Sequence, residues 1–456
     1  MITLMFGIIF LLNLNYTILR SVRTTMAVAD VGGSTRSIPF FELCVLPAAC
    51  LMTWFLSYLL RIFSIRLVFF ITLAIFVVCY VLFAFFYPIG HAQAVSGAAP
   101  THIKFLNTCT LLFYILGELW KPALIQMLFW GLMNLNLPMI QAKRIYPSLI
   151  LGASLGSILA GPVILWATSS KVWERIPISS DRWGHSFILM MLLVCIIGGI
   201  TGLLFYRLSS LLAISKVVES ISGQNSISLK KSIQVCFQIS SLRWMCWIVL
   251  ADYIAYALGE VIFLEILKHK FPNPCDYCRY MGHLSFWSSL LTILAALLVP
   301  FCVKKCRWIT VALILPIALL AIESAFFLFL RLETFSSSLF GWKHSEWIAC
   351  VVWLGSCQYC ACRAIKYTFF DTSKELAFVA LPKMEQLQGK LVIDGICARL
   401  GRGGSSVLSI GFISYAGGIL ASSHLAGITA LGLSLSWVLA TQRLNKQIDT
   451  GEVLHV

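Results

Sequence analysis

Apolar runs of about 20 residues recur along the whole chain, and they limit the fold more than any other feature. A run of that length is what an α-helix needs to cross the hydrocarbon core of a bilayer. The composition agrees, because 59% of the residues are hydrophobic and only 12% are charged, which is not the balance of a soluble protein. The sequence therefore predicts an all-α membrane protein.

We expect about 12 transmembrane helices, within about two of that number. The expected spans are Ile2–Ile18, Ile38–Leu60, Leu67–Phe86, Phe105–Leu135 (long and bent), Leu149–Trp166, Phe187–Tyr206, Trp244–Leu267, Leu284–Val303, Trp308–Leu330, Trp347–Ile365, Ser406–Ala421 and His424–Ala440. The first span has no basic segment before it and no small-residue cleavage site, so we expect a retained helix and not a signal peptide.

The spans fall into two groups of six, separated by the polar stretch Arg207–Arg243. Lys and Arg are more frequent on the side of the N-terminus, which predicts cytoplasmic termini. The expected parts are an N-terminal six-helix half (1–206), a central cytoplasmic linker (207–243), a C-terminal six-helix half (244–444) and a short cytoplasmic tail (445–456). Two such halves around a central substrate predict a major-facilitator-like transporter.

Glu118 and Lys121 lie inside the apolar stretch Leu111–Leu135. An ionisable residue at membrane depth is costly unless it faces a partner or a watery cavity, so it marks a functional site by default. Two interpretations stay open. The two residues are three positions apart and can neutralise one another on a helix, or they belong to a pathway for a substrate or a coupling ion.

Asp252, Tyr256 and Glu260 follow one another at spacings of four, which places them on one face of the seventh span. Lipid would reject such a face, so it lies in the protein interior. It either lines a watery pathway or forms a polar clamp between helices.

Cations lie near the ends of several spans, among them Arg23, Lys366 and Arg402. Such residues often extend to lipid head groups. As a set they also suit phosphate, because a guanidinium offers a fork of donors that matches phosphate oxygens. The pair Gly403–Gly404 beside Arg402 would let backbone N–H groups approach an anion at the start of a helix. An anionic, phosphorylated solute is the substrate class that this chemistry favours.

Sixteen cysteines suggest neither a disulfide framework nor a metal site, because most lie inside apolar runs. Cys275 and Cys278, in the expected loop PNPCDYCRY, either pair or stay free. No second ligand pair stands beside them or beside the cluster of Cys357, Cys360 and Cys362, so no metal is expected.

Two further features have plain explanations. Gly152, Gly156 and Gly161 form a small-residue stripe that predicts close helix packing. The net charge of +15 reflects the positive-inside bias and attraction to lipid head groups, and gives no reason to expect nucleic acid.

Seven segments together resemble the nucleotide (ATP/ADP) transporter family of obligate intracellular bacteria and plastids. They occur in the family's order over nearly the whole chain: NYTILRSVRTTMAVAD, IPFFELCVLPAA, GELWKPALIQMLFWGLMNLN, AKRIYPSLILGASLGSILAGP, YALGEVIFLEILKHKFP, AIKYTFFDTSKELAFVALP and GKLVIDGICARLGRGG.

This resemblance implies a carrier with twelve helices, no catalysis and no cofactor. The family relies on two acidic positions, which match Glu118 in GELW and Glu260 in LGEVIF, and on two cationic positions, which fall at Arg23 and Arg402. The family usually has Lys at both cationic positions. Thr24 also stands where it usually has an acidic residue.

The expected function is secondary transport of nucleotides by alternating access, with ATP exchanged for ADP across a bacterial inner membrane. Plastid import would require a transit peptide, which the N-terminus does not resemble. The expected partners are the nucleotide and the lipid bilayer, and the sequence gives no sign of an oligomeric state. We expect phosphate to bind Arg23, Arg402 and Lys366, and coupling or gating to involve Glu118, Glu260, Lys121 and Asp252.

Three alternatives remain open at this point. The first is proton-coupled uptake of other nucleotides or of a dinucleotide such as NAD. The second is a membrane enzyme acting on a phosphorylated lipid, although no acidic or histidine cluster at one interface supports it. The third is a membrane scaffold that has lost transport.

Overall fold

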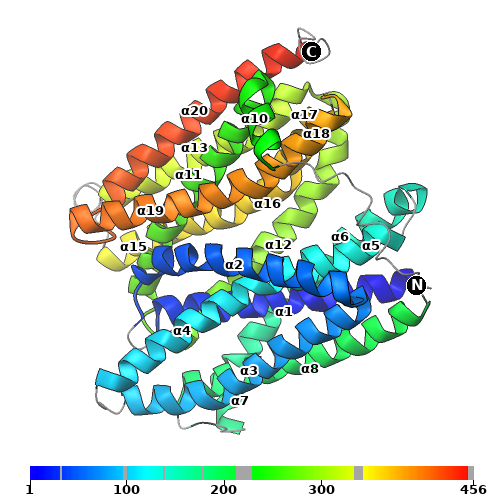
Figure 1. The fold of residues 1–456 in the computed structure, drawn as a ribbon. Helices are drawn as coiled ribbons and strands as arrows, with labels where there is room; N and C mark the ends of the chain where they lie inside the picture. The colour runs from blue at the N-terminus through cyan, green and yellow to red at the C-terminus, as the bar shows by residue number, and fades with distance from the viewer. Residues whose placement is uncertain are drawn as a thin grey trace. The chain divides into compact units, whose positions relative to one another are not determined.

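The computed structural model describes residues 1–30, 33–95, 100–136, 139–175, 179, 181–211, 229–332, 343–379 and 381–449. Within these residues the regular elements are all helices (Figure 1), and eleven are long and apolar enough to cross a membrane. The expected all-α membrane fold is therefore confirmed. The expected span Ser406–Ala421 falls on α19 (Ala398–Ala416), which its arginines, glycines and serines make less apolar than the other spans.

The chain divides into two compact units. Unit 1 comprises Met1–Gln224 and Phe271–Leu290, and unit 2 comprises Asn225–Lys270 and Leu291–Val456. Helix α12 (Pro274–Lys305) thus contributes its first part to unit 1 and its second part to unit 2.

The other helices of unit 1 are α1 (Ile2–Val28), α2 (Ser37–Ile62), α3 (Ile65–Val95), α4 (Pro100–Trp120), η1 (Lys121–Phe129), α5 (Trp130–Asn136), α6 (Met139–Ala167), α7 (Ser170–Arg175) and α8 (Arg182–Leu211).

The other helices of unit 2 are α10 (Leu229–Gln238), α11 (Ser240–Lys270), α13 (Trp308–Arg331), α15 (His344–Cys357), η2 (Gln358–Cys362), α16 (Arg363–Ile365), η3 (Lys366–Phe370), α17 (Asp371–Val379), α18 (Lys383–Lys390), η4 (Leu391–Cys397), α19 and α20 (Ser423–Asp449).

Helix α1 forms the centre of unit 1, where it packs against α4, α6 and α8. It is buried along most of its 27 residues, a length of about 40 Å. Polar side chains on it bond to its neighbours: the Asn15 amide donates to the Val194 carbonyl of α8 (3.0 Å), and Thr17 bonds to Ser157 of α6 (3.1 Å). Because these groups have partners, they do not interrupt the helix.

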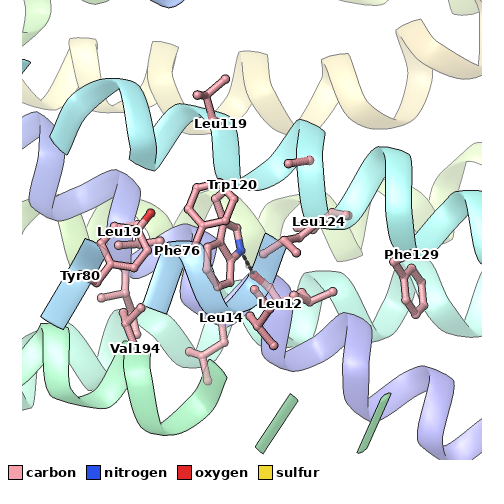
Figure 2. Packing of buried hydrophobic residues seen from close by; sticks show 14 of the residues in the cluster. Leu12, Leu14, Leu19, Phe76, Tyr80, Leu119, Trp120, Leu124, Phe129 and Val194 are labelled. Carbon is pink, nitrogen blue, oxygen red and sulfur yellow. Dashed lines mark hydrogen bonds between the residues drawn. The ribbon is translucent and has the colours of Figure 1, made fainter. Parts of the chain in front are cut away.

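A fully buried tryptophan joins the end of α4 to α1. The indole N–H of Trp120 donates to the Leu12 carbonyl over 3.1 Å, and its ring packs edge-on against Phe76 of α3. Figure 2 shows Leu19, Leu124 and Tyr80 around the same ring. The apolar interior of unit 1 thereby fixes the position of the residues that flank Trp120 in sequence.

The predicted small-residue stripe is confirmed as a packing surface. A Cβ on Gly156 of α6 would lie 2.2 Å from the Phe10 carbonyl oxygen of α1, and one on Gly152 would lie 3.0 Å from the Phe6 ring. Gly161 makes the same kind of approach to Gly282 of α12. These glycines let three helix backbones meet.

Within the described residues, four segments wind as π-helix, a rare form that is frequent at functional sites. Segment η1 continues α4 without a break, so the span expected to be long and bent is α4, η1 and α5 in succession. The other three are η2, η3 and η4 in unit 2. Lys121 opens η1 and Lys366 opens η3.

Two local expectations need correction or restriction. Cys275 and Cys278 do not lie in a loop: they are buried and free in the first turns of α12. Pro274 begins this helix, a favoured position for proline, and the Asn273 side chain caps it by accepting from the Cys275 N–H (2.9 Å). Much of the expected linker (212–228) and the last residues of the tail (450–456) lie outside the described residues.

Replacing Gly156 by Ala is expected to destabilise the protein by about 1–3 kcal/mol, the usual effect of overpacking, because the new methyl group forces α1 and α6 apart. The matched control is Gly199→Ala in α8, where a Cβ meets nothing within 4 Å and the better helix propensity adds up to about 1 kcal/mol. Thermal unfolding in detergent compares the variants, and equal melting temperatures would disprove the close approach.

Candidate functional site: two buried ion pairs

The first ion pair lies in unit 1 and joins α1 to α4. Arg23 Nη1 is 2.5 Å from Glu118 Oε2, and the two side chains are 5% and 14% exposed. The guanidinium also lies over the Tyr114 ring, 5.0 Å from its centroid. This pairing corrects the expectation that α1 ends near Ile18: with its charge matched, Arg23 is carried inside the helix.

Glycine makes room for this pair. A Cβ on Gly117 would lie 3.2 Å from Arg23 Cδ, so the residue before Glu118 leaves space for the arginine side chain. Glu118 therefore has a partner on another helix. Lys121, one turn further along, extends over the Tyr16 ring of α1 (5.4 Å to its centroid).

The second ion pair lies in unit 2 and joins α11 to η3. Lys366 Nζ is 2.5 Å from Asp252 Oδ2, and the two side chains are 13% and 2% exposed. Lys366 also lies 3.7 Å from the centroid of the Tyr253 ring. The expected span ended at Ile365, but in the structure the helix continues through η3 and α17 to Val379.

Arg402 reaches the same tyrosine ring from α19. Its guanidinium carbon lies 5.3 Å from the Tyr253 centroid, and the preceding Gly401 allows this approach, since a Cβ there would lie 2.6 Å from Tyr253 Cβ. Unit 2 thus brings Asp252, Lys366 and Arg402 together around one aromatic side chain.

The glycine pair after Arg402 does not provide the expected anion site. Gly403 and Gly404 lie inside α19, which follows η4 without interruption. Their N–H groups are therefore part of the helix and not at its free start. Any contact with an anion in this region depends on side chains.

The two pairs occupy corresponding places with inverted charge. In unit 1 the first span carries the cation Arg23 and the fourth span the anion Glu118. In unit 2 the first span of the second group, α11, carries the anion Asp252, and the fourth carries the cation Lys366. Both fourth spans change to π-helix at or just after the charged residue.

Glu260 lies apart from this cluster. It is half-buried on α11, eight positions beyond Asp252, which is about 12 Å along the helix. A Cβ on the preceding Gly259 would lie 2.2 Å from the Gln358 amide nitrogen, and that amide donates to Glu323 Oε1 over 3.0 Å. Because Gly259 has no side chain, the Gln358 side chain can pack directly against the backbone of α11.

Sequence reasoning missed Glu323 and Tyr114. Glu323 is fully buried, and its signal was a lone acid in the apolar run Trp308–Leu330. Tyr114 precedes Glu118 by one helical turn, a spacing that puts both on one face. In the described ranges no group of three His, Cys, Asp or Glu side chains is arranged to hold a metal ion.

Each cluster sets two cations beside a carboxylate, and in unit 2 Asp371 adds a second carboxylate near Lys366. Arg23 and Lys121 accompany Glu118 in unit 1, and Lys366 and Arg402 accompany Asp252 in unit 2. Such clusters suit an anion with several oxygens, because guanidinium and ammonium groups form their strongest hydrogen bonds with phosphate or carboxylate.

The fold is similar to that of solved transporters. The chain matches nucleoside transporter NupG with a TM-score of 0.63 and 13% identity, covering 97% of this chain and 99% of that one. It matches a D-xylose-proton symporter with a TM-score of 0.60 and 14% identity, covering 96% of each chain. The chain is a multi-pass membrane protein with a major-facilitator-like fold, as expected.

Sequence comparison identifies the family. The family model described as TLC ATP/ADP transporter matches residues 1–448. ADP,ATP carrier protein 1 of Chlamydia trachomatis is 28% identical over 463 residues, 97% of this chain and 87% of the relative. ADP,ATP carrier protein 2, chloroplastic, of Arabidopsis thaliana is 27% identical over 97% of this chain and 73% of the relative. The chain belongs to the TLC ATP/ADP transporter family.

Replacing Asp252 by Asn is expected to destabilise the protein by about 3 kcal/mol, because Lys366 is left buried without its carboxylate. The double variant Asp252→Asn/Lys366→Met should recover most of this loss. Unfolding free energy in micelles measures both.

The control is Glu375→Gln, which removes a partly exposed pair with Lys390 and should change stability by less than about 1 kcal/mol. If the double variant were no more stable than Asp252→Asn, the buried charge would not be the cause.

Proposed function

We propose that this protein is a secondary transporter that exchanges ATP for ADP across a bacterial inner membrane by alternating access. Its membership of the TLC ATP/ADP transporter family supports the reaction, and the names of its bacterial relatives support the substrates. The observation that carries the proposal is that both cationic positions implied by the family resemblance hold arginines set against a tyrosine ring.

In this proposal Arg23, Lys366 and Arg402 bind the phosphates of the nucleotide. Arginine presents two parallel N–H donors to a phosphate, whereas lysine acts as a point charge. Tyr253 supports the assignment, because one ring holds both Lys366 and Arg402 in place. Tyr114 orients Arg23 in the same way.

The carboxylates serve as partners for these cations when no nucleotide is bound. Glu118 neutralises Arg23 and Asp252 neutralises Lys366, and an incoming phosphate competes with each carboxylate for its cation. Exchange of one anion for another keeps the buried cation paired at every stage, so the net energy change is small. We assign gating or coupling roles to Lys121 and Glu260.

A second candidate function is proton-coupled uptake, and Glu323 is the observation that favours it. The Glu323 carboxyl is fully buried. Among the described contacts, its hydrogen-bond donor is the Gln358 amide, which carries no charge. Protonatable carboxyls at membrane depth are typical of proton-driven carriers.

The two candidates are separated by measuring uptake of α-phosphate-labelled ATP into intact bacterial cells that express the protein. Exchange predicts that unlabelled ADP outside the cells chases the label out and that a protonophore has little effect on uptake. Uptake abolished by the protonophore would support proton coupling and overturn exchange. No uptake of ATP would move the test to other nucleotides and to NAD.

Replacing Arg402 by Gln is expected to lower ATP uptake by about tenfold to 100-fold, since a hydrogen bond to a charged group contributes about 1.5–3 kcal/mol. The matched control is Arg399→Gln, one turn earlier on the same helix and also exposed, which should retain uptake. Protein amount in the membrane is compared by immunoblot. Unchanged uptake in Arg402→Gln would remove Arg402 from the phosphate site.

A further inference from the structure

A buried histidine lies between two carboxylates at the end of α1. His91 of α3 has Nε2 2.9 Å from Asp30 Oδ1 and Nδ1 3.2 Å from Asp181 Oδ2. The side chains of His91 and Asp30 are 4% and 2% exposed, whereas that of Asp181 is 35% exposed. None of these residues belongs to the proposed nucleotide site.

The geometry fixes the protonation state of the imidazole. A neutral histidine has one N–H group and one nitrogen lone pair. With a carboxylate oxygen at each nitrogen, the neutral form would direct that lone pair at a negative oxygen. Only the doubly protonated form places an N–H group and a positive charge beside both carboxylates. The two carboxylates therefore hold a proton on His91.

The remaining neighbours reinforce this arrangement. The Tyr87 hydroxyl, on α3, donates to Asp30 Oδ2, and the Trp183 indole N–H donates to the Tyr87 oxygen (2.9 Å). The N–H of Gly184 donates to Asp181 (2.9 Å).

Among the described residues, no charged side chain other than Asp30 and Asp181 is in ionic contact with the imidazole. Arg182 is turned away and donates to the Thr168 carbonyl, just after α6 (2.8 Å). Helix α4 presents Phe105 and Leu106 beside Gly90. His185 on α8 bonds through its backbone N–H to the Asp181 carbonyl.

We propose that Asp30, His91 and Asp181 form a proton-binding latch that ties the end of α1 to α3 and to the start of α8. With the proton present, the three helix ends are held together. When His91 releases the proton to solvent through the exposed Asp181, the imidazole lone pair and the carboxylate repel one another and the end of α1 loosens.

The latch acts on transport through α1. Asp30 follows Arg23 by seven positions, which is two helical turns, so loosening this end lets the part of α1 that carries the arginine shift. Because phosphate binding in our proposal needs Arg23 held against Tyr114, raising the pH slows transport. With both termini cytoplasmic, as expected from the charge distribution, this end of α1 faces the outside, and the latch responds to external pH.

Low pH acts on the latch through Asp181. Burial alone would raise the pKa of Asp181, but the hydrogen bonds from His91 and from the Gly184 N–H outweigh it and lower that pKa below its ordinary value. A depressed carboxyl pKa stabilises the fold above the ordinary pKa of an aspartate and loses this effect as the pH falls through the lowered value. On the acid side, the Asp181 contact is therefore lost only when the pH falls below the ordinary pKa of an aspartate.

The test compares three variants with the wild type. His91→Arg keeps a cation between the carboxylates at every pH, His91→Gln removes it, and Asp181→Asn removes one carboxylate. His269→Gln changes an exposed histidine of unit 2 and is the control. Thermal unfolding in detergent and ATP uptake are each followed from neutral to alkaline pH.

The wild type and His269→Gln should lose stability as the pH rises, and their uptake should fall by about fivefold or more. His91→Arg should show neither loss. His91→Gln should have a low melting temperature and low uptake that do not change with pH. In Asp181→Asn, stability and uptake should fall at a pH about one unit or more lower than in the wild type.

The latch would be overturned if the wild type showed no pH dependence, or if His91→Arg showed the same pH dependence as the wild type. The effect on uptake rests on the proposed function, whereas the unfolding measurement does not. Absence of ATP uptake with a normal unfolding profile would therefore reject the function and keep the latch.

Discussion

A charge that lies at membrane depth must be matched, and this constraint explains the arrangement of the candidate site. Arg23 is 5% exposed and Asp252 is 2% exposed, which would be prohibitive for either charge alone. Each is satisfied by an opposite charge on another helix. The packing around them follows from the same need: Gly117 makes room for the arginine, and Trp120 anchors the end of α4 where Glu118 lies.

Buried ion pairs add little net stability, because the attraction between the charges only offsets their loss of hydration. That balance suits a carrier. A pair that contributed many kcal/mol would resist a phosphate, and a cation with no partner would not stay buried. Tyr114 and Tyr253 resolve this conflict, since an aromatic face attracts a cation by about 1–2 kcal/mol without occupying the hydrogen-bond donors that a phosphate needs.

The sequence predicted most of the fold and part of the site. The span pattern follows from hydropathy alone, and Glu118, Lys366 and Asp252 were recognisable because charge is rare in apolar runs. Their partners were not. One of the two interpretations that the sequence left open pairs Glu118 with Lys121 on its own helix, and only the packing of α1 against α4 shows Arg23 opposite Glu118. The expected anion site at Gly403–Gly404 failed because helical propensity cannot show where η4 joins α19 without a break.

Helix α1 combines the two kinds of polar contact in unit 1. Its middle is held by side chains whose partners are neutral, such as Asn15, and its last third carries Arg23 and is followed by Asp30, both in ionic contacts. Neutral hydrogen bonds persist at any pH and in any substrate state. The ionic contacts do not, because one partner is replaceable by phosphate in our proposal and the other depends on a proton. The movable part of α1 is therefore its charged end, where substrate and proton act on the same helix two turns apart.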